Sequence, residues 1–67
     1  MQREELKKIF AEQLIDRMRD NNVSQRLLSE LTDIPLRTIN DYVNGKTVPN
    51  AYRLYRISKA LKCEFEF

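Results

Sequence analysis

A proline and the chain's one glycine bracket a short stretch of sequence, "PLRTINDYVNG". Within it Ile39 and Tyr42 are apolar and lie three residues apart, which is the spacing of one face of a helix. Pro35 fits the first position of a helix, where its missing N–H leaves no hydrogen bond unmade, and it pushes the preceding residue out of helical conformation. Gly45 is typical of the left-handed residue that ends a helix. The stretch therefore predicts a short, sharply bounded helix over residues 35–44.

A second short helix is expected immediately before this one. Ser24 can cap its start, because a serine hydroxyl accepts a hydrogen bond from a backbone N–H in the first turn. The segment "QRLLSEL" that follows places Leu27, Leu28 and Leu31 together on one side, and "TDI" is expected to form a turn. Two short helices joined this tightly predict a helix-turn-helix at about residues 24–44.

Longer helices are expected on either side. The turn-favouring segment "DNN" should end a first helix that runs from about Arg3 to Asp20. Asn50 is expected to cap a last helix, whose apolar side carries Leu54, Ile57 and Leu61. The apolar stripe of the first helix recurs at spacings of three and four, through Leu6, Ile9, Phe10, Leu14 and Met18.

The length limits the chain to one small domain, residues 1–67. Chains of this size bury only about 60% of the surface that unfolding exposes, so the core must be compact. We expect an all-α fold of four helices, or five if one more forms, with a short extended C-terminal tail. Phe65 and Phe67 point to the same side of such a tail. They could serve self-association or fold back onto the first helix, and the sequence leaves both alternatives open.

Composition argues against an enzyme. The chain has no histidine and one cysteine, Cys63, so neither a zinc site nor a Ser-His or Cys-His nucleophile can be assembled. We expect no cofactor, no metal and no small-molecule substrate. A run of about 18 apolar residues is also absent, so no membrane partner is expected. The N-terminal "MQREELKK" lacks the apolar core of a signal peptide, which predicts a cytoplasmic location.

Several residues between about 10 and 62 share a single register: Ser24-Gln25, Leu28, Ile34, Ile39, Asn44-Gly45-Lys46, Pro49, Ile57 and Ala60-Leu61. This register resembles the lambda-repressor-like (Cro or XRE-type) helix-turn-helix family. Each element is a weak signal alone, whereas the whole register with the correct helix spacing is fairly specific. The resemblance implies a compact lambda-repressor-like DNA-binding domain.

Single departures from the family pattern leave the fold possible. Ser29 stands where the family usually has alanine, and a serine still lets two helices approach closely. Asp33 replaces the turn glycine, and aspartate tolerates the left-handed conformation better than most residues. Pro35 stands where a serine or threonine would cap the next helix, so Asp33 is the candidate for that cap.

A double departure supports the alignment. Many members of the family pair a buried arginine late in the first helix with a glutamate just before the loop glycine, and the aligned residues here are Met18 and Val43. Replacing both charges by apolar groups can be neutral or stabilising, whereas replacing one is costly. The joint change predicts that Met18 and Val43 touch in the core.

The resemblance implies that the helix over residues 35–44 enters the major groove of double-stranded DNA, in a homodimeric, phage- or mobile-element-like repressor. Arg37 could bond guanine in bidentate fashion, Asn40 could bond adenine or a phosphate, and Leu36 could touch a thymine methyl. Asp41 could accept from cytosine or orient Arg37. The candidate base-reading residues are therefore Leu36, Arg37, Asn40 and Asp41.

Phosphate contacts fix the position of such a domain on DNA, and the resemblance implies four candidates: Gln25, Asn44, Lys46 and Thr47. Tyr52, Arg56 and Lys59 lie on the outer side of the last helix, where a solvated face is favoured over a second nucleic-acid surface. Two other functions stay open. One is an antitoxin or protein-interaction module, which a neighbouring toxin gene would mark, and the other is a fold-only domain of a longer regulator.

Overall fold

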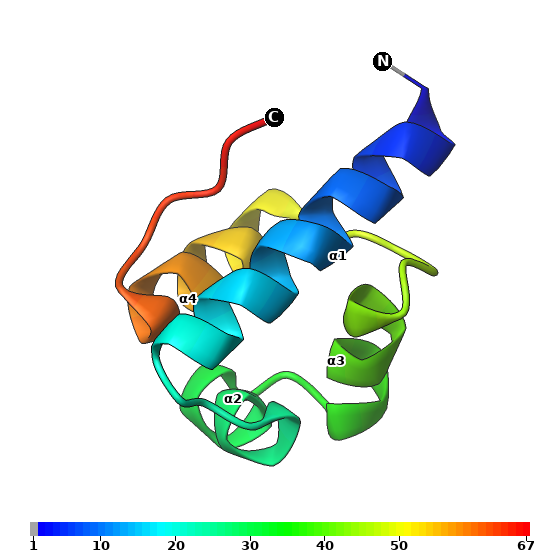
Figure 1. The fold of residues 1–67 in the computed structure, drawn as a ribbon. Helices are drawn as coiled ribbons and strands as arrows, with labels where there is room; N and C mark the ends of the chain where they lie inside the picture. Colours follow the sequence, from blue (N-terminus) through cyan, green and yellow to red (C-terminus); the bar gives the residue numbers. More distant parts are fainter. Residues whose placement is uncertain (1) are drawn as a thin grey trace.

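The computed structural model describes residues 2–67, so the first residue of the predicted domain lies outside the described part. Within that part the chain forms four helices and no strand, and its radius of gyration is 10.7 Å (Figure 1). The predicted all-α, four-helix class is confirmed. The helices are α1 (Arg3–Asp20), α2 (Gln25–Thr32), α3 (Leu36–Val43) and α4 (Ala51–Leu61).

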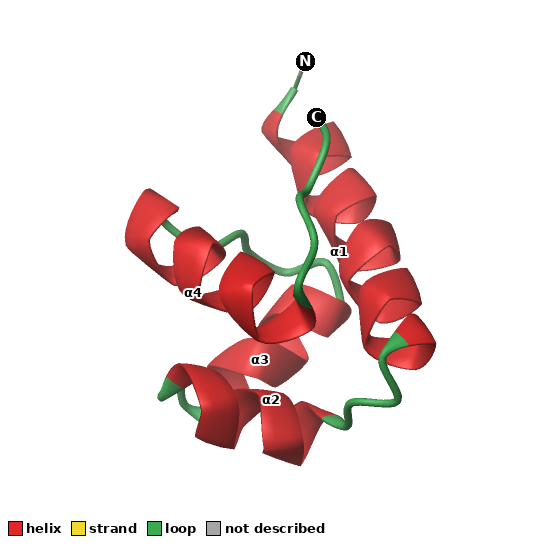
Figure 2. Ribbon diagram, turned by 90° about the vertical axis from the view of Figure 1, so that its left-hand side faces the viewer, coloured by secondary structure: helices red, strands yellow, loops and turns green. Residues whose placement is uncertain are grey.

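The short helix α3 packs against both α1 and α2, and α4 packs against α2. Figures 1 and 2 show α2 and α3 together at one end of the molecule, while the C-terminal tail returns beside α1. No helix within residues 2–67 is long and apolar enough to cross a membrane.

The two predicted N-terminal caps are confirmed. The Ser24 hydroxyl accepts a hydrogen bond from the Leu27 N–H at 3.1 Å, and the Asn50 side-chain oxygen accepts one from the Arg53 N–H at 2.8 Å. Each bond satisfies a backbone donor that the first turn of a helix leaves without a partner, and removing such a cap typically costs about 1 kcal/mol.

A left-handed residue follows each of the four helices within residues 2–67, and the one after α2 is described below. Gly45, with φ of 71°, follows α3 as predicted, and Asn22 and Lys62 take φ of 56° and 53° after α1 and α4. Behind α3, the Lys46 N–H donates to the Asp41 carbonyl at 2.9 Å, a bond that satisfies an otherwise unpaired carbonyl of the last turn. Glycine makes this turn without strain, while asparagine and lysine carry a Cβ into the same conformation.

The turn between α2 and α3 corrects two predictions. Asp33 adopts the predicted left-handed conformation, with φ of 57°, but it ends α2 and does not cap α3, which has no side-chain cap. Pro35 lies one residue before α3, and its carbonyl accepts from the Thr38 and Ile39 N–H groups. The turn is held instead by the Ser29 hydroxyl, which donates to the Ile34 carbonyl at 2.5 Å.

The core is one cluster drawn from all four helices and from Ile34 in the turn. Of the three leucines expected to face it from α2, only Leu28 is fully buried; Leu27 and Leu31 are 39% and 52% exposed. The other residue that α2 buries is Thr32, and both α3 and α4 pack against α2. The fully buried members include Phe10, Leu14, Leu28, Ile39 and Ile57.

The C-terminal tail folds back onto α1. The Phe65 ring lies 5.1 Å from the Phe10 ring, and the Glu66 N–H donates to the Gln13 side-chain oxygen at 2.9 Å. The Gln13 amide in turn donates to the Glu66 carbonyl. Of the two alternatives that the sequence left open for Phe65 and Phe67, the structure shows the fold-back, although Phe67 remains 56% exposed.

The burial of Met18 and Val43 allows a test of the alignment with the family pattern. Met18 is buried in the core cluster and Val43 packs against that cluster, so Val43→Glu places a carboxylate in apolar surroundings. We expect this variant to lose roughly 3 kcal/mol or more of unfolding free energy. Adding Met18→Arg should restore much of the loss by supplying a partner, and chemical denaturation measures both variants. Additive losses would mean that the two side chains do not touch.

Candidate nucleic-acid interface

One side of the helix α3 is buried in the core, and the opposite side is exposed to solvent. Ile39 is fully buried and Tyr42 is 2% exposed, and the Tyr42 ring meets the Phe10 ring edge to face with centroids 5.9 Å apart. On the opposite side Leu36 is 42% exposed, and Arg37 and Asn40 are also exposed. Asp41, the fourth candidate for base reading, is half-buried. The core therefore fixes the position of a helix whose outer face is free to meet a partner.

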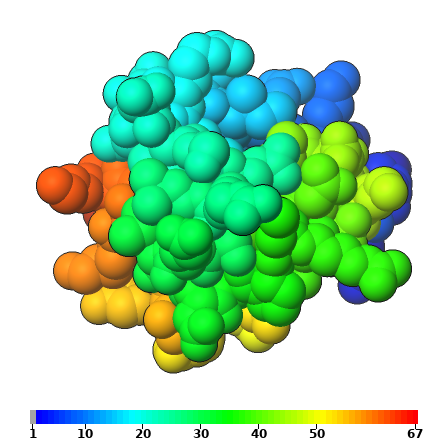
Figure 3. Space-filling model, turned by 90° about the horizontal axis from the view of Figure 1, so that it is seen from below, coloured from blue at the N-terminus to red at the C-terminus, as the bar shows by residue number. Residues whose placement is uncertain are grey.

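The start of α2 and the outer face of α3 line one open hollow. In Figure 3 the surfaces of these two helices lie side by side in green, on the face toward the viewer. The structure brings Gln25 to the same hollow as three base-reading candidates. It also adds Arg26, which the sequence interpretation missed, although a basic residue beside Gln25 was a visible signal. The hollow is lined by Ser24, Gln25, Arg26, Leu36, Arg37 and Asn40.

A chain of three side-chain amides links the two helices. The Asn40 Nδ2 donates to Gln25 Oε1 at 3.3 Å, and the Asn44 Nδ2 donates to Asn40 Oδ1 at 3.0 Å. Asn44 also bonds the Asn40 backbone carbonyl at 2.9 Å. Each amide has two N–H donors and an oxygen with two lone pairs, so Asn40 keeps one donor and one acceptor site that these bonds do not use. Gln25 uses only its oxygen in this chain, and its two N–H groups take no part in it.

Arg37 and Asp41 do not pair with each other. Within residues 2–67 the ion pairs are Lys7–Glu4 and Arg19–Asp16, both on α1. The predicted alternative in which Asp41 orients Arg37 is therefore absent from this structure. The physical reason is that an exposed pair on a helix surface gains little free energy against hydration and side-chain entropy. The guanidinium of Arg37 is left with its fork of donors available to a ligand.

The remaining phosphate candidates lie at and beyond the end of α3. Asn44 and Lys46 are exposed, and Thr47 is half-buried. The loop between α3 and α4 lies against α1, since a Cβ placed on Gly45 would stand 4.0 Å from the Ala11 Cβ. Asn44 does not line the hollow, but its side chain bonds that of Asn40, which does. Lys46 and Thr47 lie outside the hollow. The candidates thus form two groups, one at each end of α3.

Comparison with known proteins gives one result. A family model described as helix-turn-helix, of the Cro and C1 type, matches residues 14–67. The match includes all of α2, α3 and α4 together with the turn between α2 and α3. No curated protein and no solved structure matches the chain.

The amide chain predicts that Gln25 and Asn40 act together on duplex DNA. Removing either amide by Gln25→Ala or Asn40→Ala frees the other from its partner, so the two losses should not add. We expect a coupling free energy of about 0.5–1 kcal/mol in a double-mutant cycle measured by duplex affinity. The matched control is the pair Gln25→Ala and Lys46→Ala, whose effects should add because no hydrogen bond joins those side chains. Additive losses for Gln25 and Asn40 would show that the amide chain plays no part in binding.

Proposed function

The chain belongs to the lambda-repressor-like (Cro or XRE-type) helix-turn-helix family, and we propose that it is a sequence-specific repressor of the phage or mobile-element kind. Members of this family regulate transcription by binding double-stranded DNA. One observation carries the finer proposal. The outer face of α3 presents a cation, an amide and an apolar side chain, while Ile39 and Tyr42 fix the helix from behind.

The mixed chemistry of this face suits the major groove, which admits one helix and displays a distinct donor and acceptor pattern for each base pair. Arg37 lies in the first turn of α3, and side chains at the start of a recognition helix reach the base edges. We assign it to guanine O6 and N7, Asn40 to adenine, and Leu36 to a thymine methyl. Asp41 completes the set as an acceptor for cytosine N4.

Phosphate contacts supply position and much of the affinity. We assign them to Gln25 and Asn44 at the two ends of the amide chain, and to Lys46 and Thr47 in the loop. Arg26 joins this group, because it is exposed beside Gln25 in the same hollow. The whole chain, residues 1–67, acts as one domain in this proposal, and its place of action is the cytoplasm.

We further propose that two copies bind DNA as a homodimer. Helix-turn-helix dimers address half-sites about 34–36 Å apart, one turn of the duplex. The protomer measures 30 × 21 × 20 Å, so two copies can stand side by side on one face of the duplex at that spacing.

Titration across salt concentrations tests the proposal directly. A duplex selected from random sequences should bind, and the logarithm of its affinity should fall linearly with the logarithm of salt, by about 0.9 for each phosphate contact. A dimeric sample that binds no duplex even at low salt would instead favour the antitoxin or protein-interaction alternative.

Arg37 and Lys46 should respond to substitution in opposite ways. Arg37→Ala should relax the preference at one base pair per half-site, with about 1–3 kcal/mol of discrimination lost, since a bidentate guanine contact has that value. Lys46→Ala should lower affinity for all sequences alike and reduce the salt slope by about one. Both variants are measured on the selected site and on sites changed at each G·C pair in turn.

The two variants serve as controls for each other, because both remove one exposed positive charge. If Arg37→Ala lowers affinity uniformly and leaves every base preference intact, Arg37 contacts phosphate and the assignment of the reading residue is wrong.

A further inference from the structure

The outer side of α4 exposes two tyrosines beside a row of cations. Tyr52 and Tyr55 are 65% and 61% exposed, and Leu31, at the end of α2, is 52% exposed. None of these residues has a role in the proposed DNA contacts. We call this surface the basic aromatic face and define it by six residues: Leu31, Tyr52, Tyr55, Arg56, Lys59 and Lys62.

Each tyrosine of the basic aromatic face is held by a cation one helical turn later. The Arg56 guanidinium carbon lies 5.5 Å from the centre of the Tyr52 ring, and its Nη1 donates to the Tyr52 hydroxyl at 2.9 Å. The Lys59 ammonium lies 5.8 Å from the centre of the Tyr55 ring. Such contacts order the side chains before a partner arrives, which lowers the entropy that binding must remove.

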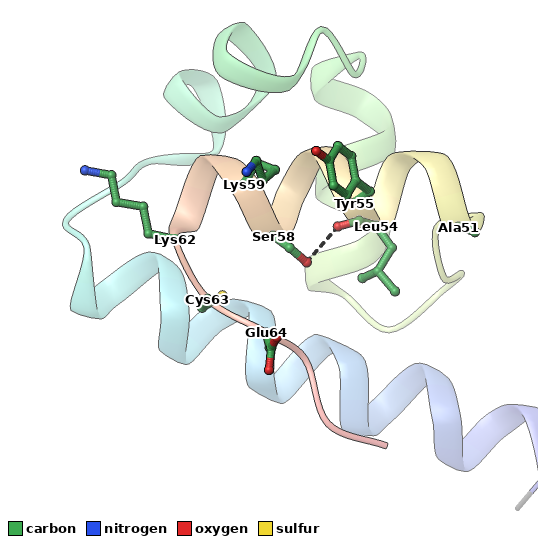
Figure 4. Close-up of a pocket in the computed structure, with 8 residues that line it drawn as sticks. All are labelled: Ala51, Leu54, Tyr55, Ser58, Lys59, Lys62, Cys63 and Glu64. Atoms are coloured by element: carbon green, nitrogen blue, oxygen red, sulfur yellow. Dashed lines mark hydrogen bonds between the residues drawn. The ribbon is translucent and has the colours of Figure 1, made fainter.

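Two hollows flank Tyr55 and Lys59. One lies toward α2 and includes Leu31, Arg56 and Ala60. The other lies toward the tail, and Figure 4 shows Tyr55 and Lys59 at its upper edge with Cys63 at the base of the tail. Tyr55 and Lys59 line both hollows, so they form a ridge between two places where apolar side chains can insert. Tyrosine and arginine are the residue types that protein interfaces favour.

The charge of the surface selects the partner. Residues 48–63 carry Arg53, Arg56, Lys59 and Lys62 and no acidic residue. Two copies of the chain meeting through this face would bring identical cations together, because a two-fold interface pairs a surface with itself. An acidic partner gains from the same charges. Glu64 lies only at the tail edge of one hollow.

We propose that the basic aromatic face binds an acidic segment of a partner protein, whose apolar side chains enter the hollows on either side of Tyr55. Single-stranded nucleic acid fits less well, because it binds through stacked bases and phosphates, whereas the two hollows beside Tyr55 offer apolar surface from Leu54 and Cys63 on one side and from Leu31 and Ala60 on the other. The exposed Leu31 side chain also has neither a charge nor a hydrogen-bond donor for a phosphate backbone.

The basic aromatic face and the hollow between α2 and α3 share no residue. Figure 3 shows α4, in yellow and orange, at the border of the green α2 and α3 surface. A partner in the two hollows of the basic aromatic face would therefore contact none of the residues that line the hollow between α2 and α3, and the proposal does not depend on the proposed reading of DNA.

A displayed library of random twelve-residue peptides, selected on the immobilised chain, tests the proposal. The enriched peptides should combine Asp or Glu with Leu, Phe or Tyr. Synthetic copies should shift the backbone NMR signals of Leu31, Tyr55 and Lys59 in the labelled protein. Tyr55→Ala and Lys59→Glu should each weaken peptide binding by about tenfold, the size of effect that central interface residues have. Lys8→Glu is the control, since it makes the same charge change at an exposed site on α1 and should leave the affinity unchanged.

Four results would overturn the proposal. Enriched peptides without an excess of Asp or Glu would show that the charge of the face does not select the partner. Equal losses of peptide affinity in Lys8→Glu and Lys59→Glu would show only a general attraction between opposite charges. Tighter binding of a single-stranded oligonucleotide of uridines at the same residues would assign the face to nucleic acid. A dimer in sedimentation that Tyr55→Ala dissociates would assign the face to a second copy. Circular dichroism of each variant confirms that the fold is retained.

Discussion

Tyr42 of α3 meets Phe10 of α1 edge to face, with ring centroids 5.9 Å apart, and the exposed helix depends on this contact for its position. α3 has eight residues, whereas isolated helices shorter than about 12–15 residues are marginal in water. Packing must therefore supply what local helix stability does not. The Phe10 ring also receives Phe65 from the tail, so one buried aromatic side chain connects α1, α3 and the C-terminus.

The junctions between helices show how a chain with one glycine makes tight turns. Ser29 bonds across the turn to the Ile34 carbonyl, and the buried Thr32 hydroxyl bonds the Leu28 carbonyl at 2.7 Å. These bonds pair polar groups that would otherwise be unsatisfied where α2 and α3 meet. The left-handed Asp33 is held within this network. A fixed turn of this kind sets the angle between α2 and α3, and hence the shape of the hollow that they line.

The parts of the fold that could be predicted from the sequence are those governed by neighbours along the chain. Ser24 and Asn50 were identified as caps because a cap bonds a backbone N–H three residues away. Gly45 was identified because its conformation is a local property. The exposure of Leu31 could not be predicted, since it depends on which neighbour covers each side of α2. The cap predicted at Asp33 was wrong for a related reason, because Ser29 and Ile34 already hold the turn.

In the candidate site, too, the features set along one helix could be predicted, whereas contacts between helices could not. The residues on the outer side of α3 could be selected from helical spacing once Ile39 and Tyr42 were assigned to the core. The amide chain through Gln25 and Asn40 joins residues on different helices, and spacing along the sequence carries no signal for it. Arg26 was missed because the family pattern gives that position no role, although the structure places it in the hollow.

The fold-back of the tail determines where a tag or a second module would leave the molecule. The bonds between Gln13 and Glu66 bring the C-terminal end beside the first helix, and Figures 1 and 2 show the start of α1 and residue 67 at the same pole, opposite α2 and α3. A tag, fluorophore or second module joined at either end would leave from the pole opposite the outer face of α3. Immobilisation through the C-terminal end therefore keeps the attachment away from the hollow between α2 and α3, which suits binding measurements on that surface.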